Sequence, residues 1–462
     1  MNILPKPLVY KKIEGYTVLD KTLCLEINSS ILEFNKKYLI EELYKQPNIN
    51  FIENGDCKVK ISLILKEDFT NTEEYRLEIF NNLIKIESGD ISGIFYGIQT
   101  FLQYIYNKNE IDNCVIEDKP RFNWRGTMLD VSRHFFSVSD VKRYIDLISF
   151  YKFNKLHLHL SDDQGWRIEI DSWPELVNIG SKSEVGSGSG GYYTKKDYIE
   201  IVEYASLRNI TIIPEIDMPG HVNAILASYP QLNIEGQIAE IYRGTKVGFS
   251  SLDTDNELTY TFINDVIKEI SELTPGKYIH IGGDEAKKTD FPKYKKFIER
   301  VQKIVKSHNK IMIGWEECAK TALESDSIVQ IWTPESDKCG IHNILSPAKH
   351  IYFDIKYNET IGLGHDWAGY TDLKKAYNWD PETVYPFVDI NSVIGIESPI
   401  WTEFITNINE IEFMSFPRLI GVAEKAWSQD SRDFDDYLNR LKKHLDYLRY
   451  KKINFYECEY LK

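Results

Sequence analysis

The chain lacks the features of a protein that binds nucleic acid or spans a membrane. No basic block stands out, and 70 acidic residues outnumber 55 lysines and arginines, giving a formal net charge of −15. Because phosphate backbones and anionic lipid surfaces are bound through clustered positive charge, this balance argues against both as partners. No segment holds about 18 uninterrupted apolar residues, so no membrane span is predicted.

Cysteine is sparse and forms no recognisable pattern. The six cysteines are scattered without a CxxC pair, which predicts neither a disulfide framework nor a zinc motif. The N-terminal segment lacks the basic start, apolar run and small-residue cleavage site of a signal peptide. We therefore expect a reduced, cytoplasmic protein, or a secreted one if such a segment has been removed.

Aromatic residues, in contrast, are abundant. They make up 13% of the chain, with nine tryptophans and 29 tyrosines. Many must pack in the core, but flat aromatic rings also serve as platforms for sugars. The length of 462 residues suits a large barrel with an accessory domain.

Residues 1–118 are predicted to form a small α+β domain. The stretch "CKVKISLIL" alternates at period two, as a half-buried strand does. "YRLEIFNNLIKIES" predicts a hairpin that turns at Asn81 and Asn82. "GIFYGIQTFLQYIY" follows with apolar residues at helical spacing, and we place the domain boundary in the segment that contains Pro120.

Residues 119–462 alternate short apolar runs with amphipathic helical stretches, which predicts a (β/α)8 barrel. A doubly wound open sheet is the alternative, but no GxGxxG follows the first run. Near the C-terminus, leucines spaced by three and four predict an amphipathic helix that packs against the barrel. The eight predicted strands are "RGTMLDVSR", "KLHLHLSDD", "TIIPEIDMPGH", "YIHIGGDE", "KIMIGWEE", "SIVQIWT", "HIYFD" and "VIGIESPIWTE".

Residues of catalytic type stand where these strands end. Active sites of such barrels lie at the carboxyl ends of the strands. So many such residues at one end of a barrel are hard to explain as ordinary solvent-exposed side chains, because buried polar groups need partners. The residues are Arg133, Asp162, His221, Glu285, Trp315, Trp332, Asp354, Trp401 and Glu403.

Two adjacent acids, Asp284 and Glu285, end the strand "YIHIGGDE". Gly282 and Gly283 before them allow the backbone to turn and to approach a ligand closely. In extended chain, successive side chains point in opposite directions. We therefore expect the two carboxylates to have separate roles rather than to share one substrate atom.

The motifs "HIGGDEA", "DVSRHFF", "KLHLHLSDDQGWRIEI", "PEIDMPGH" and "WTE" together resemble family 20 glycoside hydrolases, the β-N-acetylhexosaminidases. The resemblance implies an exo-acting enzyme that removes terminal β-linked GlcNAc or GalNAc from glycans or chito-oligosaccharides. It implies retaining, substrate-assisted hydrolysis through an oxazolinium ion, with no metal and no other cofactor.

The resemblance also implies roles for residues around the reacting sugar. Glu285 is similar to the general acid/base, with an expected raised pKa. Asp284 matches the residue that holds the acetamido nitrogen, and Tyr352 the one that binds the acetamido oxygen. Asp162 and His221 resemble a pair that supports the acid.

Further residues resemble the walls and the hydroxyl-binding end of the family's pocket. Arg133 and Glu403 match residues that hold sugar hydroxyls, and Asp354 one near the sugar's far edge. Three tryptophans match the walls of the acetamido pocket and a fourth the stacking platform beyond it. These are Trp315, Trp332 and Trp401, and then Trp367.

Two alternatives use the same residues differently. His157 and His159 point to one side of a strand and, with nearby carboxylates, would suit a metal-dependent hydrolase on the same barrel. Packing and hydrogen bonding inside the barrel is the simpler explanation for these histidines. A catalytically inactive carbohydrate-binding relative is the second alternative, but it should show a substitution at Asp284, Glu285 or Tyr352, and none is present.

Overall fold

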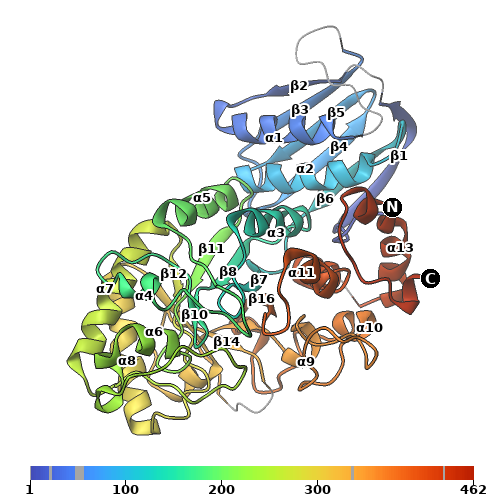
Figure 1. The fold of residues 1–462 in the computed structure, drawn as a ribbon. Helices are drawn as coiled ribbons and strands as arrows, with labels where there is room; N and C mark the ends of the chain where they lie inside the picture. Colours follow the sequence, from blue (N-terminus) through green and yellow to red (C-terminus); the bar gives the residue numbers. More distant parts are fainter. Residues whose placement is uncertain (1, 20–22, 47–56, 334–337, 430–431) are drawn as a thin grey trace.

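The computed structural model describes residues 2–19, 23–46, 57–333, 338–429 and 432–462. Figure 1 shows a small sheet-and-helix domain, in blue, above a larger barrel. Among the described residues, no helix has both the length and the apolar character needed to cross a bilayer.

The N-terminal domain is a mixed six-stranded sheet in the order β1-β6-β4-β5-β3-β2. Helices α1 (Glu33–Tyr44) and α2 (Ile91–Ile105) pack on it, and α2 lies between sheet and barrel (Figure 1). The predicted hairpin is confirmed, because Phe80 pairs with Leu83 and both turn asparagines have positive φ. The strands are β1 (Val9–Val18), β2 (Leu23–Ile27), β3 (Val59–Leu65), β4 (Tyr75–Phe80), β5 (Leu83–Ser88) and β6 (Glu110–Asp118).

Eight parallel strands close into a barrel, which confirms the predicted fold and excludes the open sheet. The order is β11-β12-β13-β14-β15-β16-β7-β8, so β8 closes on β11. The strands are β7 (Trp124–Asp130), β8 (Lys155–His159), β11 (Thr211–Glu215), β12 (Tyr278–His280), β13 (Ile311–Trp315), β14 (Ile328–Ile331), β15 (His342–Leu345) and β16 (Val393–Ile400).

Helices surround the barrel (Figure 1). Many of them begin at a side-chain cap, and the hydroxyl of Ser137, for example, accepts a hydrogen bond from the Asp140 amide in a capping box. The longer ones are α3 (Val138–Phe150), α5 (Lys195–Ser206), α7 (Glu257–Leu273), α8 (Phe291–Ser307), α12 (Arg418–Trp427) and α13 (Phe434–Tyr450). The shorter ones are α4 (Glu175–Asn178), α6 (Asn223–Ser228), α9 (Ala348–Ile351), α10 (Leu373–Tyr377) and α11 (Ile408–Ser415).

The prediction of the seventh barrel strand is wrong. The strand is β15, His342–Leu345, and the stretch "HIYFD" instead ends the short helix α9 and continues as loop. The true strand is only four residues long and begins with an exposed histidine, so its apolar signal is weak. Tyr352 and Asp354 therefore lie after a strand–helix turn rather than at a strand end.

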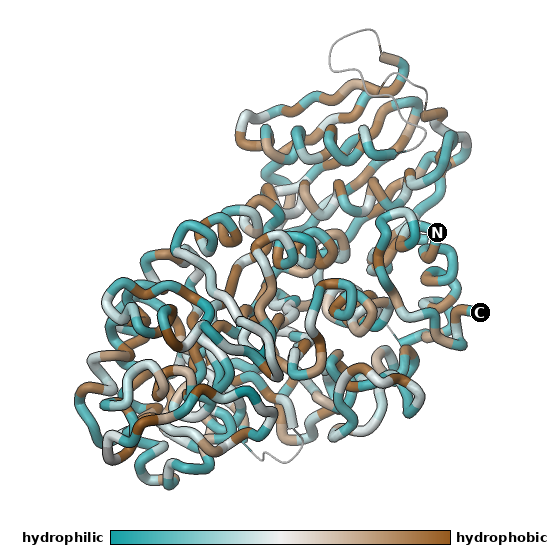
Figure 2. Tube along the Cα trace, in the orientation of Figure 1, coloured by the Kyte–Doolittle hydropathy of each residue, from teal (hydrophilic) through white to brown (hydrophobic). Residues whose placement is uncertain are grey.

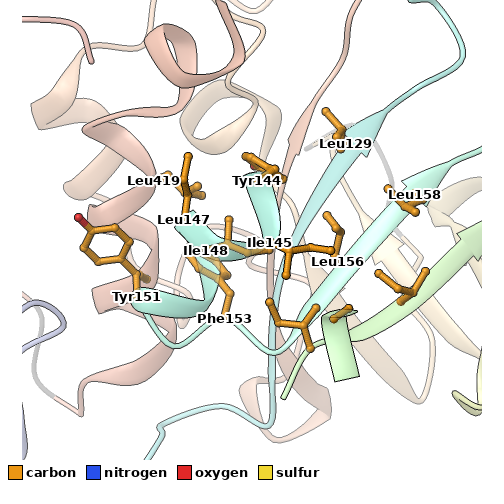
Figure 3. Close-up of a cluster of buried hydrophobic side chains, with 14 of the residues drawn as sticks. Leu129, Tyr144, Ile145, Leu147, Ile148, Tyr151, Phe153, Leu156, Leu158 and Leu419 are labelled. Atoms are coloured by element: carbon orange, nitrogen blue, oxygen red, sulfur yellow. The ribbon is translucent and has the colours of Figure 1, made fainter. Parts of the chain in front are cut away.

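Successive side chains of β8 alternate between the surrounding helices and the barrel interior. Figure 3 shows Leu156 and Leu158 of β8 beside Ile145 and Ile148 of α3, while Figure 2 shows brown apolar segments along strands and inner helix faces. The leucines face the helices, so the residue between them, His157, faces the barrel interior. The interior of the barrel is therefore available for polar groups.

The C-terminal helix α13 packs on the barrel helices through its predicted leucine stripe. Leu441 and Leu448 are fully buried. Tyr447 stacks on Phe150 of α3, with ring centroids 4.5 Å apart. Arg440 of α13 also donates to the carbonyl of Ile3, so the helix ties the N-terminal segment to the barrel.

The N-terminal domain contacts the barrel where its strands begin. The Arg125 guanidinium, near the start of β7, donates to both carboxylate oxygens of Glu73 at 2.8 and 3.0 Å. Trp427 donates to Asp118, and its ring lies 5.1 Å from that of Tyr96. This end of the barrel is opposite to the carboxyl ends of the strands.

The expectation of wholly reduced cysteines is also wrong. Cys24 and Cys57 form a disulfide in the N-terminal domain, and the other four cysteines are free. Two cysteines 33 residues apart carry no spacing signal, because the parallel pairing of β2 with β3 is what brings them together. The cellular compartment stays a prediction.

Candidate active site

A cavity of about 290 Å³ opens at the carboxyl ends of the barrel strands. It gathers residues that follow β7, β11, β12, β13, β14 and β16, and two more that follow α9. All the predicted site residues except Asp162 line it, and Asp162 is buried directly behind. The lining is Arg133, His221, Thr245, Val247, Asp284, Glu285, Trp315, Trp332, Tyr352, Asp354, His365, Trp367, Trp401 and Glu403.

The backbone after β12 explains how two neighbouring acids reach one cavity. Gly282 and Gly283 both have positive φ, and a Cβ at Gly282 would lie 1.8 Å from a carboxylate oxygen of Asp217. Glu285 itself has a φ of 44°. The chain is thus not extended here, and the expectation that the two side chains diverge is wrong. A carboxylate oxygen of Asp284 and one of Glu285 each lie 3.6 Å from Nε2 of His221.

The environment gives the two acids different proton affinities. Burial raises the pKa of Asp284, and the charges of Glu215 and Glu285 add to it against the lowering effect of His221. Burial also raises the pKa of Glu285, but hydrogen bonds with His221 and Lys287 outweigh it, so the net pKa lies below its usual value. The predicted rise of the Glu285 pKa is therefore wrong for the unliganded site.

A buried chain of polar groups supports His221 from behind. Its Nδ1 lies 3.3 Å from Asp162, whose carboxylate also receives Nε2 of His159 at 2.8 Å. The guanidinium of Arg133 lies 2.7 Å from the same carboxylate. Burial alone would raise the pKa of Asp162, but Arg133 and His221 hold it far below its usual range. Asp162 is thus an ionised anchor for His221.

A second group of charged and titratable side chains lines the cavity. Glu403 lies 4.0 Å from Arg133 and 3.3 Å from Nε2 of His365. Against the effect of burial, the charge of Arg133 and the hydrogen bond with His365 lower the pKa of Glu403 to about 2. Burial raises the pKa of Asp354 to about 7, partly opposed by His365. One of its carboxylate oxygens is buried with no hydrogen-bond partner among the residues that the structure describes, which leaves it available for a hydroxyl of a ligand.

Aromatic rings form another part of the lining. Trp332 stacks on Tyr352 with ring centroids 6.3 Å apart, and Trp315 lies 5.9 Å from Trp401. Trp367 is 55% exposed and stands edge-on to Trp332 at the mouth. The lining of the cavity thus combines aromatic rings with charged groups, as suits a sugar ring.

Beneath the cavity, both predicted histidines pack and hydrogen-bond inside the barrel. His157 lies 2.9 Å from Glu215 and 2.8 Å from Glu397, and His159 lies 2.5 Å from Glu215. The carboxylate of Glu215 also accepts from the Trp315 indole at 3.0 Å. This network fixes the wall tryptophan. Residue groups with atoms close enough to surround a cation are His157/Glu215/His280, His159/Glu215/Asp217, Asp162/Asp217/His221 and His221/Asp284/Glu285.

Several residues of the site escape the sequence analysis. Glu215, in the motif "PEIDMPGH", is the last residue of β11. Its place at a strand end could have identified it as a residue of the site. Glu316 accepts hydrogen bonds from the backbone amides of Trp332 and Thr333 and so positions Trp332 in the wall of the cavity. His365 lies two residues before Trp367, on a loop whose path carries no sequence pattern. Thr245 and Val247 come from another such loop.

Comparisons with known proteins agree with this geometry. Residues 122–430 match the model of the glycosyl hydrolase family 20 catalytic domain, and residues 1–119 match that of family 20 domain 2. A β-N-acetylhexosaminidase of Cellulomonas fimi is 36% identical over 96% of this chain and 93% of its own.

Solved structures of similar proteins share the whole fold. The Streptomyces plicatus N-acetyl-β-hexosaminidase, in complex with Thio-NAglucal, is 40% identical with a TM-score of 0.94, covering 99% of this chain and 97% of that one. A mutant of the Streptomyces plicatus enzyme has been solved with the product GlcNAc, at the same TM-score of 0.94 and 40% identity, over 100% of this chain and 97% of that one. The chain belongs to glycosyl hydrolase family 20.

Proposed function

We propose that the chain is an exo-acting β-N-acetylhexosaminidase that removes terminal β-linked GlcNAc or GalNAc from glycans or chito-oligosaccharides. The observation that carries the proposal is the pair Asp284 and Glu285 at one imidazole, in a cavity walled by aromatic rings. The GlcNAc found in the mutant Streptomyces plicatus enzyme supports the same class of ligand.

Asp284 and Tyr352 act on the 2-acetamido group. The acetamido oxygen attacks C1 while the bond from C1 to the glycosidic oxygen breaks, giving an oxazolinium ion. Positive charge develops on the acetamido nitrogen, and the carboxylate of Asp284 stabilises it. That charge favours ionised Asp284, against the burial that raises its pKa in the free enzyme. Tyr352, 3% exposed, donates its hydroxyl hydrogen to the acetamido oxygen and orients it.

Glu285 moves the proton. It gives its proton to the departing glycosidic oxygen, and then accepts a proton from the water that attacks C1 and reopens the ring. Two inversions at C1 give a product with retained β configuration. A bound sugar removes water from Glu285 and so raises its pKa toward the protonated form that the first step needs. Asp162 holds His221 in place beside both acids.

The far end of the cavity binds the hydroxyls of the terminal sugar. Arg133, Glu403 and Asp354 present charged groups to them, and Trp315, Trp332 and Trp401 enclose the acetamido group. Trp367 offers its exposed face to the sugar beyond. Arg133 and Asp354 are buried, so the hydroxyls they bind belong to a chain-terminal sugar rather than to an internal one. The net charge of −15 argues against nucleic acid as a partner.

Hydrolysis of three chromogenic substrates side by side tests the proposal. The β-N-acetylglucosaminide or β-N-acetylgalactosaminide should be cleaved and the β-glucoside should react negligibly, because it has no acetamido oxygen to attack C1. Binding of GlcNAc without turnover of any of the three would instead indicate an inactive carbohydrate-binding relative. Faster turnover of the glucoside would refute substrate assistance.

A further inference from the structure

An exposed lysine pairs with Glu285, the proposed acid, which lines the cavity. Nζ of Lys287 lies 3.0 Å from a carboxylate oxygen of Glu285, and its side chain is 63% exposed. The stem of Lys287 runs along Gly248, where a Cβ would lie 2.7 Å from its Cδ atom. Thr245 and Val247 of the same loop line the cavity. The stem of Lys287 is therefore packed against the loop that contributes Thr245 and Val247 to the cavity, while its ammonium pairs with Glu285.

The mechanism removes the partner of this ammonium. Glu285 must be protonated when it donates to the glycosidic oxygen, and a neutral carboxyl pairs only weakly with a cation. Arg133 lines the cavity, but its side chain is 4% exposed and ion-paired to Asp130 and Asp162. Lys287 is thus an accessible positive charge that lacks a counter-ion in the protonation state that reacts.

The departing sugar lies next to this charge. The glycosidic oxygen must come within hydrogen-bond reach of Glu285, so the first ring of the leaving group lies within a few ångströms of the Lys287 ammonium. We propose that Lys287 recognises a carboxylate on the leaving-group sugar, as in a uronic acid. This inference rests on the proposed function and names the class of substrate that the site prefers.

The effect on rate should be modest but separable. A partly exposed ion pair contributes roughly 0.2–1 kcal/mol, so the uronide should be favoured about 1.4-fold to fivefold in kcat/KM. The net charge of −15 repels anionic substrates at long range, which opposes any general preference for them. A preference must therefore come from a local cation, and salt should weaken it.

Two disaccharides that differ only in the carboxylate test the inference: GlcNAc linked β-1,4 to glucuronic acid and to glucose. The ratio of their kcat/KM values is the readout, since a change in Glu285 itself affects both substrates. The wild type should favour the uronide, Lys287→Gln should bring the ratio to one or below, and Lys287→Arg should retain it. Lys288→Gln removes the same charge from the next exposed residue and should leave the ratio unchanged.

The outcomes separate this inference from the proposed function. A ratio of one in the wild type, or a ratio that Lys287→Gln does not alter, would overturn the role of Lys287 while leaving the hexosaminidase in place. Failure to cleave either disaccharide, together with inert chromogenic N-acetylhexosaminides, would overturn the proposed function itself. A ratio that falls in 0.5 M salt supports the inference, because an exposed ion pair is screened there, with a Debye length of about 3–5 Å.

Discussion

Nε2 of His221 lies 3.6 Å from a carboxylate oxygen of Asp284. The same nitrogen lies 3.6 Å from a carboxylate oxygen of Glu285, so two acids that are neighbours in the chain both approach one imidazole. Burial lowers the pKa of His221, but Asp162, Asp217 and Asp284 outweigh it and raise the net pKa well above its usual value. The two acids thus differ in chemistry rather than in location, and kinetics must separate them.

Glu285→Gln should reduce activity most on substrates with poor leaving groups. The loss should be about 10²–10⁴-fold on an alkyl or sugar glycoside, because protonation by a general acid contributes on this scale. An activated nitrophenol needs less protonation and should lose less. The measurement is kcat/KM on a series of leaving groups, with circular dichroism as a check on folding. Equal losses across the series would count against Glu285 as the acid.

Asp284→Asn should lower kcat more than it raises KM. Asparagine keeps the size and a hydrogen-bonding group but cannot neutralise the oxazolinium nitrogen, so the loss falls on the transition state. A thiazoline mimic of the cyclised sugar should inhibit the wild type far more strongly than the product does, and should lose most of this advantage on the variant. Covalent labelling of a carboxylate by an activated 2-fluoro sugar, with the thiazoline inert, would point to an ordinary two-carboxylate mechanism.

The sequence predicted the barrel because seven of its strands are apolar runs that end in residues of catalytic type. It missed β15 because a four-residue strand with an exposed first residue carries little pattern. It also predicted that the side chains of Asp284 and Glu285 point in opposite directions. That prediction failed because the positive φ at Glu285 is set by tertiary packing rather than by residue type. The positions of His365 and Lys287 at the site depend on which loops meet across the barrel. No local sequence pattern predicts these loop contacts.

Removal of metal ions should leave activity intact. The histidines and carboxylates beneath the cavity are close enough to surround a cation, but their contacts are explained by hydrogen bonds to one another. Steady-state rates after exhaustive dialysis against EDTA and 1,10-phenanthroline should match those of the untreated enzyme. Loss of activity that zinc restores would favour a metal-dependent hydrolase on the same barrel.

Stability should fall at alkaline pH through the barrel histidines. Burial lowers the pKa of His157, but Glu215 and Glu397 outweigh it and raise the net pKa to about 9 from 6.5. The stabilisation by charged His157 is therefore complete below about pH 6.5 and is lost as pH rises through about 9. The measurement is Tm from pH 6 to 10 for the wild type and for His157→Asn. The Tm of the wild type should fall toward pH 10 more steeply than that of the variant. Parallel Tm curves would refute the contribution of His157.

The contact between the two domains should matter for stability and not for catalysis. Arg125 is 1% exposed and pairs with both oxygens of Glu73, at the end of the barrel opposite to the cavity. Glu73→Gln leaves a buried guanidinium without its counter-charge, which costs about 3–5 kcal/mol. The matched control is Glu117→Gln, which breaks an exposed pair with Arg76 and should cost about 0–1 kcal/mol. Urea midpoints should separate the two variants, while KM for a chromogenic N-acetylglucosaminide stays at its wild-type value in both.

If Glu73→Gln were as stable as Glu117→Gln, the domains would be joined mainly by apolar packing of Trp427 on Tyr96. A changed KM in the Glu73 variant would mean that the N-terminal domain influences the sugar site through the barrel.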